Sequence, residues 1–258
     1  MNAGRPLEGI GIVLTRPREQ SVAAARELER EGARVIMFPS LAIEACPETP
    51  ELGEALRGLA SASLAIFVSL NAVEHGVAAA RRHGPWPPAV AVAGMGDATA
   101  AALRNSGFSR VISPAVRFDS EGLLMRPELQ AVRGQNIIIF RGTGGREKLR
   151  EALQARGARV TYAECYRRVR PASDPTELLA AWSRGAVHAV QAMSVETLAN
   201  FVALTGARGE RLLAATTLVV PHETIARHED ALRFGRVVVA APGEAGLKDA
   251  LKQLRIKT

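Results

Sequence analysis

Gly32-Ala33-Arg34-Val35 recurs about 125 positions later as Gly157-Ala158-Arg159-Val160. Other residues repeat at the same offset: Arg16 with Arg141, Leu28 with Leu153, Ser69 with Ser194, and Thr99 with Thr224. The shared residues are few, so the weight of the repeat lies in their falling at equivalent structural places. The repeat predicts two similar lobes with a cleft between them, and clefts of this kind commonly bind ligands.

Ten short β-branched runs alternate with helical segments, five in each half of the chain. We expect strands near 10–14, 34–38, 64–68, 90–93 and 110–112, and again near 136–140, 159–163, 187–191, 217–220 and 236–240. Most are continuous apolar runs, which are typical of strands covered by helices on both faces. The pattern therefore predicts an α/β protein with two small, doubly wound parallel sheets of the flavodoxin-like kind.

Two of the predicted helices share one design. Apolar residues recur at three- to five-residue steps over 18–32, and Gly32 stands where a left-handed cap would end the helix. The segment 148–157 repeats this arrangement and ends at Gly157. The Pro-rich segments 84–88 and 171–175 are predicted loops.

Periodicity does not fix the order in which the chain passes through the two sheets. The halves could fold one after the other, or the first two strands could join the last three while the middle five form the second sheet. Beyond Pro39, the larger apolar residues Leu41 and Ile43 stand two positions apart, and 162–168 is a matching extended segment. Two extended crossings side by side in one waist favour the exchanged arrangement.

Length and composition describe an ordinary globular chain. At 258 residues, one large or two small domains are both allowed. The chain is 47% hydrophobic and 23% charged, and no apolar run approaches the roughly 18 residues that cross a bilayer. The polar start has no signal-peptide layout, so we expect a cytoplasmic protein without a membrane partner. Cys46 and Cys165 are too few for a disulfide framework and have no zinc-type neighbours.

The basic residues are biased towards arginine. The net charge is +7 from 33 basic residues, and the only lysines are Lys148, Lys248, Lys252 and Lys257. Genome base composition could explain this bias. An anionic partner is the functional alternative, because guanidinium pairs with carboxylate or phosphate in a planar fork. Nucleic acid is disfavoured, since the arginines are scattered among acids and aromatic residues make up only 4% of the chain.

Hydroxyl-bearing or small residues follow most of the predicted strands, at the sheet edge where ligands bind in folds of this type. The segments are Thr15-Arg16-Pro17, Ser69-Leu70-Asn71, Gly96-Asp97-Ala98-Thr99, Arg141-Gly142-Thr143-Gly144-Gly145, Ser194-Val195-Glu196 and His222-Glu223-Thr224. Each hydroxyl is also a favoured helix N-cap whatever the function. Together, six helix N-termini around one cleft predict a ligand with several carboxylates, held mostly by main-chain N–H groups.

Three familiar motifs are incomplete. In Gly94-Met95-Gly96-Asp97-Ala98-Thr99, Thr99 replaces the last glycine of a dinucleotide fingerprint. The segment 141–146 lacks the Gly-Lys-Ser/Thr ending of a phosphate-binding loop, and Ala226 replaces the second histidine of a zinc-protease helix that would begin at His222. We therefore expect neither a nucleotide cofactor nor a metal.

Several segments, in order along the whole chain, resemble the successive signatures of the uroporphyrinogen-III synthase family. They are Thr15-Arg16-Pro17-Arg18-Glu19-Gln20, Phe67-Val68-Ser69-Leu70-Asn71-Ala72-Val73, Gly96-Asp97-Ala98-Thr99-Ala100-Ala101-Ala102-Leu103, Ser120-Glu121-Gly122-Leu123-Leu124, Arg141-Gly142 with Gly145-Arg146, and Tyr166-Arg167-Arg168. Each motif alone is weak, whereas the ordered set is specific.

The resemblance implies two flavodoxin-like lobes with exchanged threading, joined by a two-stranded waist. Lobe one would comprise 1–38 and 168–258, and lobe two 39–167. It also implies a lyase of porphyrin, heme and other tetrapyrrole biosynthesis. This enzyme closes the linear tetrapyrrole hydroxymethylbilane to uroporphyrinogen III, with loss of water and inversion of the last pyrrole ring. The acetate and propionate arms of that substrate match the predicted polycarboxylate, and the resemblance implies no cofactor.

The implied mechanism asks for geometry more than for reactive side chains. Loss of hydroxide gives an azafulvene cation that closes without the enzyme to the uninverted isomer. The protein must hold a folded conformation in which the last ring is attacked at its substituted carbon, through a spiro intermediate. Such positioning can contribute several kcal/mol to lowering a barrier.

The resemblance also implies roles for individual residues. It maps Tyr166 onto a tyrosine that faces the cleft and helps the hydroxyl leave, which a phenol of pKa about 10 can do by donating a proton or hydrogen bond. The alternative is that Tyr166 only packs between the lobes. The implied substrate contacts are Arg16, Ser69, Asn71, Thr99, Arg141, Gly142, Ser194 and Thr224, with helix capping as a second or only duty of the hydroxyls.

Val68 and Met193 depart from the family, which usually has a hydroxyl before the serine. They keep open a non-catalytic tetrapyrrole- or polycarboxylate-binding regulatory protein of the same fold. A third class, an exported solute-binding protein, is disfavoured by the missing export signal. We further expect a monomer that makes transient contact with the preceding pathway enzyme.

Overall fold

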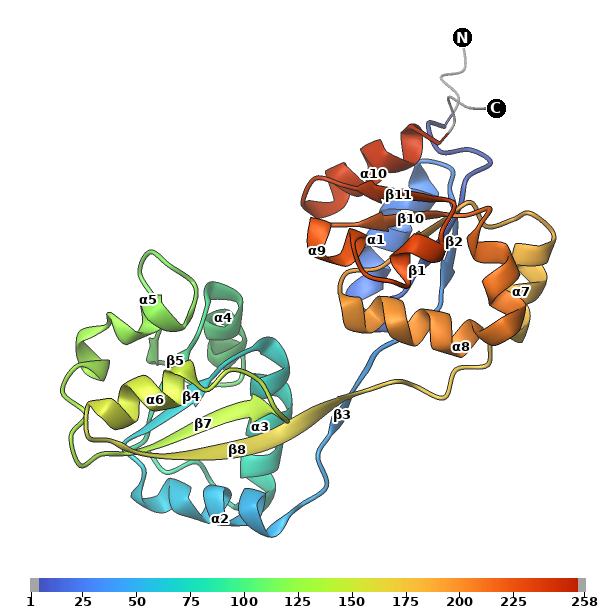
Figure 1. Cartoon of the computed structure of the whole chain (residues 1–258). Helices are drawn as coiled ribbons and strands as arrows, with labels where there is room; N and C mark the ends of the chain where they lie inside the picture. The colour runs from blue at the N-terminus through green and yellow to red at the C-terminus, as the bar shows by residue number, and fades with distance from the viewer. Residues whose placement is uncertain (1–4, 255–258) are drawn as a thin grey trace. The chain divides into compact units, whose positions relative to one another are not determined.

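The computed structural model describes residues 5–254 and contains two separate sheets (Figure 1). The first four and last four residues, which the predicted lobe one includes, lie outside the described residues, as does Lys257. The described chain divides into two compact units. One consists of the residues up to Ala42 together with those from Val169 onward, and the other runs from Ile43 to Arg168. We call them the five-stranded unit and the six-stranded unit.

The five-stranded unit has the strand order β11-β10-β9-β1-β2, and all of its neighbouring pairs are parallel. Its strands are β1 (Gly11–Leu14), β2 (Arg34–Met37), β9 (Ala189–Gln191), β10 (Thr217–Val220) and β11 (Arg236–Val239). Its α-helices are α1 (Arg18–Arg30), α7 (Thr176–Ser183), α8 (Val195–Leu213), α9 (Glu223–Ala226) and α10 (Gly243–Lys252).

The six-stranded unit has the order β3-β8-β7-β4-β5-β6. Its strands are β3 (Ala42–Ala45), β4 (Leu64–Phe67), β5 (Ala91–Gly94), β6 (Val111–Ile112), β7 (Asn136–Gly142) and β8 (Arg159–Val169). Its α-helices are α2 (Pro50–Gly58), α3 (Leu70–His83), α4 (Asp97–Asn105), α5 (Ser120–Leu124) and α6 (Lys148–Ala155). Three-residue 3-10 turns at Leu59–Ser61, Pro127–Leu129 and Ala231–Arg233 complete the described helical segments of the two units.

These sheet orders confirm the exchanged threading and exclude the sequential one. The first two strands, β1 and β2, share a sheet with the last three, whereas the chain between them forms the other sheet. The chain leaves the five-stranded unit through β3 and returns to it through β8, and these two strands are neighbours in the six-stranded sheet. All ten predicted strands are present, and β3 and β8 occupy the two segments predicted as extended crossings.

Both sheets are buried on both faces, as the continuous apolar runs predict. In β4, Leu64 and Ile66 belong to one buried cluster while Ala65 and Phe67 belong to another. The strands of the five-stranded sheet alternate in the same way between two clusters. A parallel sheet with helices on each side requires this pattern. It leaves the carboxyl ends of the strands as the edge where loops can form a site.

The predicted helix ends are also confirmed. Gly32 and Gly157 follow α1 and α6 with φ of +98° and +86°, a region that glycine enters without a Cβ penalty. Among the described residues, no helix combines the length and the apolar character needed to cross a membrane.

Candidate functional site

The six-stranded unit contains a cavity of about 700 Å³ at the carboxyl ends of β4, β5 and β7. We call it the larger cavity. Its wall is formed by Val68, Ser69, Met95, Arg117, Phe118, Asp119, Ser120, Glu121, Ile139, Arg141, Gly142, Thr143, Gly144, Gly145, Arg146, Lys148, Leu149, Tyr162, Tyr166 and Arg168. The parallel sheet explains this gathering, because the ends of β4, β5 and β7 meet at one edge while the longer β8 continues past them.

Tyr166 lies in the wall of the larger cavity and is only 5% exposed. Its Oη is 3.1 Å from Oγ of Ser69, and the same Oγ accepts a hydrogen bond from the backbone N–H of Ala72 at 3.1 Å. The ring of His75 stacks against the phenol at 5.9 Å between ring centroids. The Tyr166 hydroxyl is therefore held in one place, facing a serine that also caps α3.

Gly142 allows the Tyr166 ring to lie against the end of β7. A Cβ at position 142 would come within 2.6 Å of Cε2 and 2.7 Å of Cζ of Tyr166. The register between β7 and β8 also shifts here, since Arg141 pairs with Glu164 while Gly142 pairs with Tyr166. Such a bulge re-aims a side chain. The sequence motif Arg141-Gly142 therefore has a steric reason.

Arg141 is buried in the same wall, with its side chain 6% exposed. Its Nη1 pairs with Oε1 of Glu147 at 3.1 Å, Nη2 donates to the carbonyl of Gly144, and Nε lies 3.9 Å from Oε1 of Glu164. The guanidinium also lies 4.3 Å from the centre of the Tyr162 ring. Each nitrogen of this guanidinium thus has a protein partner, because Nε also donates to the carbonyl of Gly142 at 3.2 Å, and these contacts fasten the loop between β7 and α6.

Two ionisable groups beside Arg141 are perturbed. The Tyr162 hydroxyl donates to Oε2 of Glu147 at 2.9 Å, and this bond, followed by Arg141, lowers the pKa of the Glu147 carboxyl. Burial, followed by the same hydrogen bond, raises the pKa of Tyr162. The pair therefore keeps Glu147 ionised as the counter-ion of Arg141.

The cations of the larger cavity fall into two classes. Arg117 pairs with Asp119 at 2.7 Å, Lys148 pairs with Glu121, and Arg141 pairs with Glu147. Arg146 and Arg168 also line the cavity and are exposed, yet within residues 5–254 their side chains have neither an ion-pair nor a hydrogen-bond partner. Two guanidinium groups at this cavity are therefore free to bind an anion.

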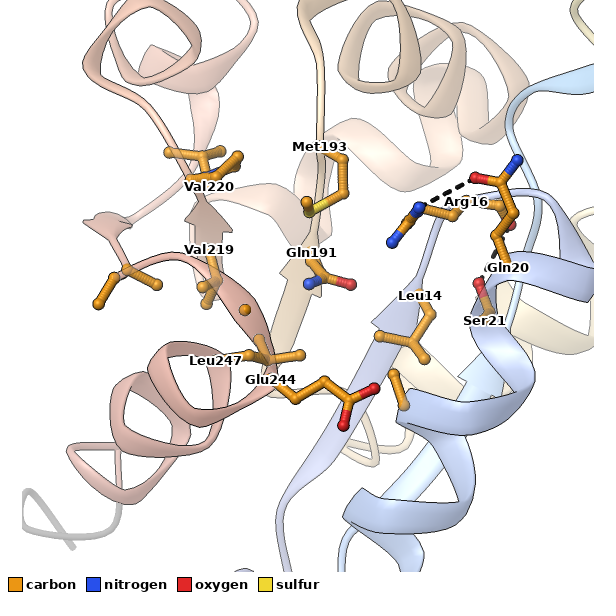
Figure 2. Close-up of a pocket in the computed structure, with 15 residues that line it drawn as sticks. Leu14, Arg16, Gln20, Ser21, Gln191, Met193, Val219, Val220, Glu244 and Leu247 are labelled. Carbon is orange, nitrogen blue, oxygen red and sulfur yellow. Dashed lines mark hydrogen bonds between the residues drawn. The ribbon is translucent and has the colours of Figure 1, made fainter. Parts of the chain in front are cut away.

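The five-stranded unit has a smaller cavity of about 110 Å³ at its own carboxyl edge (Figure 2). Arg16, after β1, lines it and donates from Nη2 to Oε1 of Gln20 at 3.0 Å. Gln191 at the end of β9, Met193 beyond it and Glu244 of α10 also line it, over an apolar floor. The two family departures thus lie at cavities, Met193 here and Val68 at the larger cavity.

The predicted site residues separate into groups. Ser69, Arg141, Gly142 and Tyr166 share the larger cavity, and Arg16 lines the smaller one. Asn71, in the first turn of α3, is half-buried, and Ser194 caps α8 by accepting from the N–H of Thr197 at 3.1 Å. Asn71, Ser194, Thr99 and Thr224 line neither of these two cavities.

The expectation that Thr99 and Thr224 cap helices is wrong. Gly96 and His222 hold the N-cap positions of α4 and α9 with extended backbones, so both threonines lie inside their helices. Thr99 is 6% exposed, whereas Thr224 is exposed. The capping predictions for Ser69 and Ser194 are confirmed.

Sequence reasoning missed Arg146 and Arg168 as site residues. Arg168 stands two positions after Tyr166 on one strand, a spacing that places side chains on the same face. Arg146 directly follows the Gly144-Gly145 turn beyond β7. The spacing from Tyr166 to Arg168 and the glycine turn before Arg146 are both visible in the sequence and could have indicated these residues. Among the described residues, no group of three or more His, Cys, Asp or Glu side chains is placed to hold a metal ion.

Comparison with known proteins gives one consistent result. A family model described as "Uroporphyrinogen-III synthase HemD" matches residues 22–247. The uroporphyrinogen-III synthase of Salmonella typhimurium is 36% identical over 198 residues, covering 76% of this chain and 80% of that protein. The enzyme of the same name from Escherichia coli is 32% identical over 190 residues, covering 73% and 77%.

A solved structure agrees at the level of the fold. The crystal structure of a mutant uroporphyrinogen III synthase from Thermus thermophilus matches with a TM-score of 0.56 at 22% identity, covering 96% of this chain and all of that one. At this identity, the likeness concerns the two-domain α/β fold alone.

Proposed function

The chain belongs to the uroporphyrinogen-III synthase family, and on that premise we propose that it closes hydroxymethylbilane to uroporphyrinogen III, with loss of water and inversion of the last pyrrole ring. It is accordingly a lyase of porphyrin and heme biosynthesis. The observation that carries the proposal into the structure is the larger cavity, where a fixed phenol, the main chain of 142–146 and two unpaired arginines share one wall.

The reaction needs geometry above all. Once hydroxide has left, the azafulvene cation closes without help, but to the uninverted isomer. The enzyme must hold the bilane so that the last ring is attacked at its substituted carbon and passes through a spiro intermediate. Holding reacting atoms in place can supply several kcal/mol of the effect. Binding contacts therefore decide which isomer forms.

We assign the proton-donating role to Tyr166. Its hydroxyl lies at the larger cavity and is oriented by Ser69 at 3.1 Å, which supports a phenol that protonates the departing hydroxyl as the carbon–oxygen bond breaks. The phenolate would recover a proton when the inverted ring is completed. The opposing possibility is that Tyr166 only fills the space beside Gly142.

The substrate contacts are proposed on both units. In the six-stranded unit they are Ser69, Asn71, Arg141 and Gly142, with Arg141 acting through the loop that it fastens. In the five-stranded unit they are Arg16, Ser194 and Thr224. Thr99 would contribute its main-chain N–H, which belongs to the first turn of α4 and has no partner within the helix.

We further propose a cytoplasmic monomer that makes transient contact with the enzyme producing its substrate. Support for the compartment comes from Cys46 and Cys165, which are both free thiols and suit a reducing environment. Size-exclusion chromatography with light scattering would test the monomer.

The direct test mixes purified protein with freshly made hydroxymethylbilane and separates the products by isomer. We expect the type III isomer. If only type I forms, the catalytic proposal fails. In that case, Val68 and Met193 would favour a non-catalytic protein that binds tetrapyrroles or other polycarboxylates, and calorimetry with uroporphyrinogen III would measure that binding.

Replacing Tyr166 with phenylalanine tests the proton donor. We expect Tyr166→Phe to slow closure by roughly 100-fold or more, because a positioned general acid contributes about 100- to 10,000-fold, and to leave the isomer ratio unchanged. Tyr162→Phe is the matched control, since it removes the other phenol of the larger cavity, whose hydroxyl is bound to Glu147. Unaltered turnover in Tyr166→Phe would assign that residue to packing alone.

A further inference from the structure

We infer that Arg146 and Arg168 are specificity-determining residues, which bind carboxylate arms of the tetrapyrrole and select substrates by the number of those arms. The inference deepens the proposed function and rests on it. It concerns two residues outside the predicted site, and its starting point is the pairing of charges around the larger cavity.

Five cations line the larger cavity, against only two carboxylates, Asp119 and Glu121. Asp119 and Glu121 are already shared by Arg117 and Lys148, at 2.7 Å and 3.5 Å from Arg117. The buried Arg141 takes Glu147 and lies near Glu164. Among the described residues, no carboxylate pairs with Arg146 or Arg168. An anionic ligand would therefore meet cations that do not first have to break an ion pair.

The backbone fixes where these two arginines stand. Arg168 lies on β8, two residues after Tyr166, and both side chains line the larger cavity. Arg146 follows Gly144 and Gly145, whose φ values of +73° and +106° favour glycine. The Nη2 atom of Arg141 occupies the space where a Cβ on Gly145 would lie, at 2.6 Å. Arg141 thus holds the turn that presents Arg146.

The chemistry of the substrate matches this arrangement. Acetate and propionate arms carry carboxylates on short flexible links, and guanidinium binds a carboxylate through two parallel N–H donors. Neither arginine touches the reacting carbon in this proposal. Their contacts would form with the bound substrate and persist in the transition state, so they would lower KM and leave kcat nearly unchanged.

The test compares two double variants of equal net charge. Arg146→Gln with Arg168→Gln removes the unpaired cations. Arg110→Gln with Arg167→Gln is the matched control, because Arg110 is exposed away from the larger cavity and Arg167 pairs with Glu44 at 3.0 Å. Steady-state KM and kcat for hydroxymethylbilane are measured at several ionic strengths.

We expect the Arg146/Arg168 variant to raise KM by roughly fivefold for each arginine, the size typical of exposed ion pairs, with kcat within about twofold. The dependence of KM on salt should also flatten, because fewer charge contacts remain to be screened. A rise in KM no larger than in the control pair overturns the inference, as does a fall in kcat without a change in KM.

A binding measurement separates this inference from the proposed function. Uroporphyrinogen III and coproporphyrinogen III, in which methyl groups replace the acetate arms, are titrated anaerobically by calorimetry. The unaltered protein should prefer uroporphyrinogen III, and the Arg146/Arg168 variant should lose most of that preference. An equal preference in both proteins overturns the inference even if type III isomer is made. If the protein does not make the type III isomer, the proposed function is wrong, whichever porphyrinogen the calorimetric titration shows it to prefer.

Discussion

Arg16 and Arg141 occupy equivalent places in the two units, each just beyond or at the end of a strand that begins a repeat. Arg141 has a side chain 6% exposed and is held by Glu147, by the carbonyl of Gly144 and by the Tyr162 ring. Arg16 is only half-buried and bonds to the neutral amide of Gln20. Of these two equivalent arginines, Arg141 therefore has a structural role in the six-stranded unit, whereas Arg16 remains available to bind a ligand in the five-stranded unit.

The connecting loops explain this difference. Between β1 and α1 the chain has only residues 15–17, and the helix begins directly after Pro17. Between β7 and α6 it has residues 143–147, which include two glycines with positive φ and end in the acidic partner Glu147. A longer loop needs contacts that hold it in place, and the buried guanidinium of Arg141 supplies them. The longer loop also leaves room for the larger cavity.

The largest expected effect is a loss of stability when Arg141 is replaced, compared with the same replacement at Arg16. Arg141→Ala should lower the free energy of unfolding by about 2–3 kcal/mol, less than the loss of a fully buried ion pair because Glu147 and Glu164 are partly exposed. Arg16→Ala should change it by less than about 0.5 kcal/mol. Urea unfolding followed by circular dichroism measures both. Equal losses of unfolding free energy in the two variants would show that the two arginines do not differ in their structural role.

The sequence predicted where the strands lie along the chain and favoured the exchanged threading, but it did not predict this contrast. The apolar runs and the glycine-ended helices follow local rules, so all ten strands and the ends of α1 and α6 could be predicted. The pairing of Arg141 with Glu147 depends on the shape of a loop, and the free state of Arg146 and Arg168 depends on which carboxylates lie elsewhere. Thr99 and Thr224 were misplaced because a glycine or histidine in extended conformation can begin a helix without a side-chain cap.

A smaller effect is expected from adding a methyl group at the end of β7. Gly142→Ala places a Cβ within 2.6 Å of the Tyr166 ring, so the ring must move, at a cost of about 1–2 kcal/mol in unfolding free energy. The five-stranded unit has Pro17 at the equivalent position and tolerates a side chain there. Closure of hydroxymethylbilane should slow at least as much as in Tyr166→Phe.

Gly58→Ala is the matched control for that substitution. Gly58 ends α2, and a Cβ there would make an ordinary contact of 3.7 Å with Ile138. We expect unchanged activity and a slight gain in stability, because alanine is a better helix former than glycine. If Gly142→Ala keeps its activity and stability as Gly58→Ala does, the close approach of the Tyr166 ring to β7 is not required for function.

The smallest expected effect is a pH dependence confined to the Arg141 anchor. The pKa of Glu147 is lowered by the hydrogen bond from Tyr162 and then by Arg141, so its stabilising contribution is complete above the ordinary value of 4.5 and is lost as the pH falls through the lowered one. Tyr162→Phe removes the larger cause. The pKa of Glu147 should rise, and the anchor should fail at a higher pH.

Carbon-detected NMR titration of the Glu147 carboxyl measures this shift directly. Arg150→Gln is the control, because Arg150 is a weaker cause of the lowered pKa and its removal should move the titration less. Arg16 gives the second contrast, since its partner Gln20 does not titrate and the Arg16–Gln20 hydrogen bond should persist across the same acid range. An identical Glu147 titration in the parent protein and in Tyr162→Phe would show that the phenol does not support the anchor, leaving Arg141 alone to keep the carboxylate ionised.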